Sequence, residues 1–131
     1  MTECMTDERT EEEKLAAILK REPRFQREAY RFVQEALDFA RRKLGRKGHL
    51  SGRELAEGFR DLARERFGLL AKTVLEQWGV RSTADIGSLV YNLIEEQIMV
   101  REEGKDRRED FDNVYDFERA FNDNFAIEME D

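Results

Sequence analysis

The chain has 131 residues, and 30 acidic against 23 basic side chains give it a formal net charge of −7. This length is enough for one hydrophobic core and too short for two, which excludes a two-domain enzyme. The apolar runs fall short of the roughly 20 residues that a membrane-spanning helix needs, so we expect no membrane partner.

The first thirteen residues, MTECMTDERTEEE, carry six acidic groups and one basic group. They contain no apolar stretch of the kind found in a secretion signal, and they hold the single cysteine, Cys4. We therefore expect a cytoplasmic protein without an intrachain disulfide. The predicted organisation is a disordered acidic lead over residues 1–13, one helical domain over residues 14–125 and an acidic tail over residues 126–131.

Two helices are predicted before residue 45. Thr10 and Glu13 form a capping-box pattern, which starts a first helix that runs to Arg21. Over residues 25–44 the apolar side chains recur at steps of three and four, which is typical of one buried helical face. Gly45 is the predicted stop, because glycine readily takes the left-handed conformation that ends a helix.

Further helices are predicted up to residue 94. Ser51 and Glu54 repeat the capping box ahead of one apolar stripe, and a second stripe is formed by Leu70, Val74, Leu75 and Trp78. Ser82 and Asp85 then precede the most apolar helix, over residues 86–94, which we expect at the centre of the domain.

The segment after this helix has two interpretations. Residues 98–115 fit either a short β-hairpin or a charged loop, because apolar residues at both ends flank a highly charged middle. A short final helix is predicted from Phe117, Ala120 and Phe121. The predicted fold class is therefore mainly α, a compact single domain of five or six helices, with a hairpin near residues 98–115 as an open alternative.

Four stretches carry a family resemblance: YRFVQEALDFARRKLG, HLSGRELAEGFRDLARERFG, LLAKTVLEQWGVRSTADIGSLVYNLIEE and REDFDNVYDFERAF. Together, over residues 15–122, they resemble a small family of bacterial conserved hypothetical proteins, the Plancto-Ver type. The resemblance implies a one-domain bacterial protein. It brings no catalytic residue and no ligand to any position of this chain.

Metal and triad chemistry lack the residues that they require. Zinc sites need several His or Cys ligands, and the chain offers only His49 and Cys4. The acidic run DRREDFDN lacks the glycine and the spacing of a calcium-binding loop, which favours a solvated acidic turn. Ser51 is explained as a helix cap rather than as a nucleophile. We predict no catalytic residue, no metal site and no cofactor, and we expect that the protein is not an enzyme.

Basic residues gather around two glycines over residues 41–54, RRKLGRKGHLSGRE, just ahead of a predicted helix N-terminus. Helix N-termini attract phosphate groups, and GRKG has the form of the backbone clamp of KH domains, although the flanks predict helices rather than a sheet. The alternative is a glycine-capped connection with solubilising cations. The candidate residues for anion or nucleic-acid binding are Arg41, Arg42, Lys43, Arg46, Lys47 and Arg53.

A second nucleic-acid hypothesis is a helix-turn-helix around Gly79. The helix that would enter the major groove has no Lys or Arg between Ser82 and Ile98, and it carries Asp85, so its DNA affinity should be poor. The basic segment is therefore the better nucleic-acid candidate.

Aromatic residues crowd the C-terminal tract. Most should belong to the core, but any that stay exposed would form an anchor patch for a partner, so the partner-contact candidates are Phe111, Tyr115, Phe117 and Phe121. The function that we expect is that of a non-enzymatic cytoplasmic protein–protein interaction module, as a subunit of a larger assembly or as a homo-oligomer. The alternative is RNA or DNA binding through residues 41–54.

Overall fold

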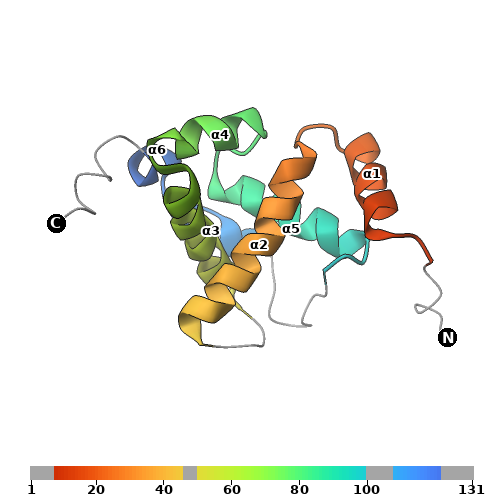
Figure 1. Cartoon of the computed structure of the whole chain (residues 1–131), viewed down its shortest axis with the longest axis horizontal. Helices are drawn as coiled ribbons and strands as arrows, with labels where there is room; N and C mark the ends of the chain where they lie inside the picture. Colours follow the sequence, from red (N-terminus) through yellow and green to blue (C-terminus); the bar gives the residue numbers. More distant parts are fainter. Residues whose placement is uncertain (1–7, 46–49, 100–107, 122–131) are drawn as a thin grey trace.

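Helices make up almost all of the regular structure (Figure 1). The structure is a computed structural model, and it describes residues 8–45, 50–99 and 108–121. In chain order its elements are α1 (Glu11–Arg21), α2 (Arg27–Leu44), α3 (Gly52–Phe67), the 3-10 turn η2 (Gly68–Leu70), α4 (Ala71–Gln77), α5 (Thr83–Glu95), the 3-10 turn η3 (Arg108–Phe111) and α6 (Phe117–Ala120). The predicted fold class, a mainly α single domain, is confirmed. None of the described helices is long and apolar enough to cross a membrane.

The predicted caps start the helices. The side chains of Thr10 and Ser51 each accept a hydrogen bond from the backbone three residues later, and Glu13 and Glu54 reciprocate, which completes both capping boxes. Gly45 ends α2 with φ 68°, in the left-handed conformation that the sequence predicts.

The core lies between α2, α3 and α5. Helix α5 contacts α1, α2, α3 and η3, and seven of its thirteen residues are buried, which agrees with its expected central position. Helix α3 packs along α2 so closely that a methyl group added at Gly58 would lie 2.7 Å from the Cβ of Ala40. The loop before α5 packs against the start of α2, where the backbone N–H of Gln26 donates to the carbonyl of Trp78 at 3.0 Å.

The predicted boundary of the acidic lead is wrong by a few residues. Helix α1 begins at Glu11, inside the range 1–13, because the Thr10 cap and the acidic first turn stabilise it. Glu12 also forms ion pairs with Arg27 and Arg31 of α2. Residues 1–7 and the acidic tail 126–131 lie outside the part of the chain that the structure describes.

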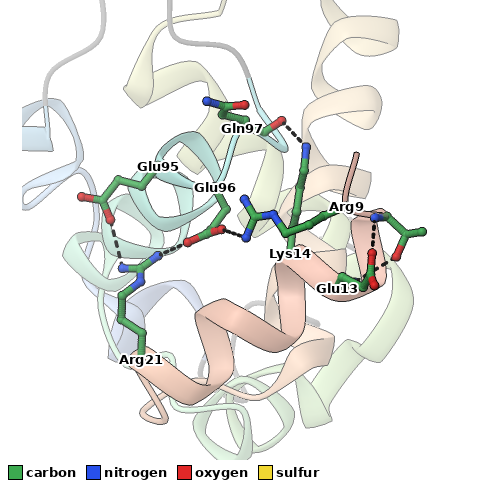
Figure 2. Close-up of polar contacts among 8 residues, drawn as sticks. Arg9, Glu13, Lys14, Arg21, Glu95, Glu96 and Gln97 are labelled. Carbon is green, nitrogen blue, oxygen red and sulfur yellow. Dashed lines mark hydrogen bonds and ion pairs between the residues drawn. The ribbon is translucent and has the colours of Figure 1, made fainter. Parts of the chain in front are cut away.

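Polar contacts tie α1 to the C-terminal end of α5 (Figure 2). The guanidinium of Arg21 lies 3.0 Å from a carboxylate oxygen of Glu95 and 3.4 Å from one of Glu96, and Arg9 pairs with the second oxygen of Glu96 at 2.8 Å. The ammonium of Lys14 donates to the carbonyl of Gln97 at 3.4 Å. The first helix is therefore part of the folded domain.

The described parts of residues 98–115 form no strand. Gln97 takes φ 64°, and the backbone N–H groups of Ile98 and Met99 then donate back to the carbonyl of Leu93, so they are not available to a hairpin. The predicted return strand over residues 111–115 is absent, because η3 ends at Phe111 and residues 112–115 form turns and bends. The ring of Phe111 lies against the backbone of Gly87 in α5, where an added methyl group would be 3.0 Å from the Phe111 Cβ. Residues 100–107, the middle of the predicted hairpin, lie outside the described ranges.

Candidate interaction surface

Three of the four described cations of the basic segment lie beside carboxylates. Lys43 contacts Asp61 at 2.6 Å, and Arg53 and Arg41 lie 3.9 and 4.0 Å from carboxylates of their own helices. Arg42 is exposed at the end of α2, and Arg46 and Lys47 lie outside the described residues. Cations that are already paired release fewer counterions from nucleic acid, which lowers the affinity expected of this segment.

Asp61 is the residue that sequence analysis missed here. Burial alone raises the pKa of its carboxyl, but hydrogen bonds from Lys43 and Arg60 outweigh burial and hold the pKa below its ordinary value. A shallow cavity of about 300 Å³ between α2 and α3 includes these three residues, and Glu54 and Glu57 add two more carboxylates to its wall. The concave surface beside the basic segment therefore has as much acidic as basic character, which does not suit a phosphate group.

The C-terminal aromatic residues pack inward. Phe111, Phe117 and Phe121 are buried, so the hypothesis that they form an exposed partner-contact patch is wrong for these three positions. The reason is that residues 108–121 close the core from outside, with the Phe117 and Phe121 rings in an edge-to-face pair whose centroids are 5.0 Å apart.

Tyr115, the fourth aromatic candidate, is half-buried and has a structural hydrogen bond. Its hydroxyl donates to the carbonyl of Ala56 in α3 at 2.8 Å, and its ring stacks on Phe117. Burial raises the pKa of this hydroxyl far above its ordinary value, although Arg60 lies over the ring and opposes the shift. A phenol held protonated in this way anchors the C-terminal segment to α3.

A cavity of about 500 Å³ opens at the N-terminal end of α5, and Arg81 and Asp112 are among the residues that line it. Three of its other polar groups have structural partners. Ser82 caps α5, Asp116 caps α6, and the buried Thr83 hydroxyl accepts a hydrogen bond from the backbone of Val114 at 3.2 Å. These groups hold residues 112–117 against α5, and they do not form a nucleophile and base within hydrogen-bond distance.

Among the residues that the structure describes, the most exposed large apolar side chains lie at the turn between α3 and α4. We call Gly68, Leu69 and Leu70, which form η2, the elbow. Leu69 is 54% exposed and Leu70 is 64% exposed. Gly68 has φ 56°, a conformation that favours glycine, so the chain changes direction here and both leucines project from the turn.

The exposure of Leu70 corrects the predicted apolar stripe of α4. Ala71 and Leu75 are buried, while Leu70 and Val74 lie on the outer side of the helix. The spacing of the apolar residues allowed either Ala71 with Leu75 or Leu70 with Val74 to face the core. The backbone direction set at Gly68 turns Ala71 and Leu75 toward the core. The sequence held one signal, because three consecutive apolar residues, 69–71, cannot all lie on one helical face.

Half-buried aromatic rings lie next to the elbow. Phe67, the last residue of α3, contacts Trp78 edge-to-face at a centroid distance of 5.7 Å, and both rings contact Phe32 of α2. Leu70, Val74 and Trp78 follow one another at steps of four on α4. Val74 and Trp78 are half-buried, so they extend the apolar surface of the elbow only in part, and the exposed positions of α4 are the polar Thr73 and Gln77.

Comparisons with known proteins add no assignment. The chain matches no protein family model, no curated protein and no solved structure. Within residues 8–45, 50–99 and 108–121, no three His, Cys, Asp or Glu side chains are grouped as they would be to hold a metal ion. The function must therefore be argued from the surface itself.

Proposed function

We propose that the protein is a non-enzymatic cytoplasmic interaction module, a subunit of a larger assembly or of a homo-oligomer, and that the elbow forms the centre of its contact surface. The observation that carries the proposal is the pair of adjacent leucines, 54% and 64% exposed, on one rigid turn. Apolar residues presented together on a surface are characteristic of sites that bind other proteins.

The energy available at this surface suits a specific contact. Full burial of a leucine side chain contributes roughly 1.5–3 kcal/mol, so burial of the exposed parts of Leu69 and Leu70 contributes about 1–2 kcal/mol each. The turn is held by two backbone hydrogen bonds, from Gly68 to Arg64 and from Ala71 to Gly68. A preformed turn loses little conformational entropy on binding, which leaves more of that energy for affinity.

The experiment compares two surfaces of the full-length protein. Leu69→Asp with Leu70→Asp places charge on the elbow, and the matched control is Leu44→Asp, at a leucine that is 47% exposed at the end of α2. Mass in solution and cross-linking in the host cell measure the assembly. We expect the wild-type and Leu44→Asp proteins to assemble and the elbow variant to be monomeric. A wild-type protein that is monomeric and partnerless would refute the proposal, and so would equal loss of assembly in both variants.

The nucleic-acid alternative has weaker support, because Lys43 pairs with Asp61 and the neighbouring cavity carries further carboxylates. It still predicts binding that weakens steeply with salt and is lost when Arg42, Lys43, Arg46 and Lys47 become alanine. Filter binding with a mixed RNA and DNA pool at two salt concentrations tests it. The family resemblance of residues 15–122 stays a prediction.

A further inference from the structure

The cavity at the N-terminal end of α5 holds charged side chains that the fold does not use. Its volume of about 500 Å³ falls within the range typical of ligand pockets, and it shares no lining residue with the elbow. Three charged residues line it, namely Arg81, Asp112 and Asp116. The Asp116 carboxylate accepts a hydrogen bond from the backbone of Glu118 at 3.1 Å and so caps α6. Arg81 and Asp112 are left, with opposite charges.

Both of these charges are available to a ligand. Arg81 and Asp112 are exposed, and the side chain of neither makes an ion pair or a hydrogen bond with any residue that the structure describes. They do not pair with each other, although they line one cavity. The side-chain amide of Asn113, which offers both donors and an acceptor, is likewise unbonded within the described chain. A ligand with two opposite charges would satisfy groups that the folded chain leaves to water.

The backbone that carries these side chains is held in place by hydrogen bonds. The backbone N–H of Arg81 donates to the Asp85 carboxylate at 2.8 Å. The backbone N–H of Val114 donates to the buried Thr83 hydroxyl at 3.2 Å, which fixes residues 112–114 to the start of α5. A pocket that is already formed loses little conformational entropy when a ligand enters it, so more of the contact energy appears as affinity.

The rest of the lining includes apolar groups. The rings of Tyr115 and Phe117 stack with their centroids 5.8 Å apart, and Ala84 adds a methyl group. Small-molecule pockets combine such apolar walls with a few polar groups that fix the orientation of the ligand. The matching ligand has an apolar body, a carboxylate for a guanidinium and an ammonium for a carboxylate. An amino acid with an apolar side chain has all three.

We infer that this cavity binds a free amino acid with an apolar side chain, whose carboxylate pairs with Arg81 and whose ammonium pairs with Asp112. A simple anion would meet the Asp112 carboxylate as a like charge, and a simple amine would meet Arg81 in the same way, whereas a zwitterion satisfies both. The inference goes beyond the proposed function, because it gives the protein a small-molecule site in addition to the elbow.

Titration of the isotope-labelled full-length protein, followed by nuclear magnetic resonance, tests the site. The probes are free alanine, leucine and phenylalanine. Each is compared with the amine that lacks its carboxylate and with the acid that lacks its amino group, which for phenylalanine are phenethylamine and hydrocinnamate. We expect saturable shifts of the amide resonances over residues 81–84 and 112–117. The best amino acid should bind at least about tenfold more tightly than either of its analogues.

Two variants remove one charge each and keep a hydrogen-bonding amide. Arg81→Gln and Asp112→Asn should each weaken binding of the amino acid about tenfold. The matched controls are Arg42→Gln and Glu65→Gln, at exposed charged residues outside the cavity, and they should bind as the wild type does. Unchanged resonances in the rest of the spectrum show that each variant keeps the fold.

An analogue that binds as tightly as its amino acid would overturn the inference, and it would leave a site for a simple anion or a simple amine. Resonance shifts confined to other segments would also overturn it, as would equal losses of affinity in the control variants. Absence of saturable binding by all three amino acids would show that Arg81 and Asp112 are only solvated surface charges. None of these outcomes depends on whether the protein assembles through the elbow.

Discussion

Gly58 offers the sharpest test of how the two long helices are packed. Glycine inside a helix is normally a cost of about 1 kcal/mol relative to alanine, so helix propensity alone predicts that Gly58→Ala stabilises α3. The structure predicts the opposite. The new methyl group would lie 2.7 Å from the Cβ of Ala40, an atom that cannot move without moving α2.

The size of the overlap decides the sign. Carbon atoms in ordinary contact are about 3.5–4 Å apart, so the helices must separate by about 1 Å. Overpacking of this kind costs about 1–3 kcal/mol, and separation also weakens the edge-to-face pair of Phe32 and Phe59, whose centroids are 5.0 Å apart. The overpacking cost is larger than the gain in helix propensity, so we expect Gly58→Ala to lower the free energy of unfolding by about 1–2 kcal/mol.

Urea unfolding followed by circular dichroism measures this change, and Ala40→Gly provides the control background. With Ala40 reduced to glycine the methyl groups no longer collide, so the same Gly58→Ala substitution should become stabilising by up to about 1 kcal/mol. A change of sign between the two backgrounds is the expected outcome. If Gly58→Ala stabilised the wild-type protein, the close approach of α2 and α3 would be refuted.

Three further predictions concern the left-handed residue after α5, the loss of stability at alkaline pH and the ion pairs of Arg21. Gln97→Gly should raise stability by about 0.5–1 kcal/mol in urea unfolding, because Gln97 is held at positive φ, and an unchanged midpoint would contradict the left-handed cap. The pKa of Tyr115 is raised in the folded state, so this hydroxyl ionises in the unfolded chain before it ionises in the folded protein. The stability that the protonated hydroxyl contributes is therefore fully present below a pH of about 10 and is lost as the pH rises above that value. Tyr115→Phe should cost about 0.5–1.5 kcal/mol at pH 7, because it removes the hydrogen bond from the Tyr115 hydroxyl to the Ala56 carbonyl. Its unfolding midpoint should fall less between pH 9 and 11 than that of the wild type, and parallel curves would argue against a raised pKa at Tyr115. Arg21→Ala should cost no more than about 1 kcal/mol, since Arg21 and Glu95 are 41% and 64% exposed and Glu96 keeps its ion pair with Arg9. Thermal unfolding should show this difference becoming smaller at high salt.

Cap residues show what local sequence can determine. Thr10 with Glu13 and Ser51 with Glu54 find their hydrogen-bond partners within three residues, so their geometry needs nothing from the rest of the chain. The left-handed end of α2 at Gly45 is equally local. These signals placed the starts of α1 and α3 and the end of α2 correctly.

The candidate site could be predicted only in part. The clustering of basic residues along the sequence identified the segment around Lys43. The carboxylate that pairs with Lys43 belongs to Asp61, which is eighteen residues away on another helix. The aromatic tract was recognised as well, yet its burial depends on Phe111 lying against Gly87 of α5. The spacing of residues within one segment does not show which residue of a distant segment will contact them.

The sequence by itself determined the helical class, the capping signals and the shortage of metal ligands, because each depends on composition or on residues a few positions apart. Tertiary structure alone decided which apolar residues are exposed. Leu70 and Leu75 share one apolar pattern, but the backbone direction at Gly68 and the packing of α4 bury Leu75 and leave Leu70 on the surface. Burial is a property of what packs against a side chain, and packing is set by contacts between segments far apart in the chain.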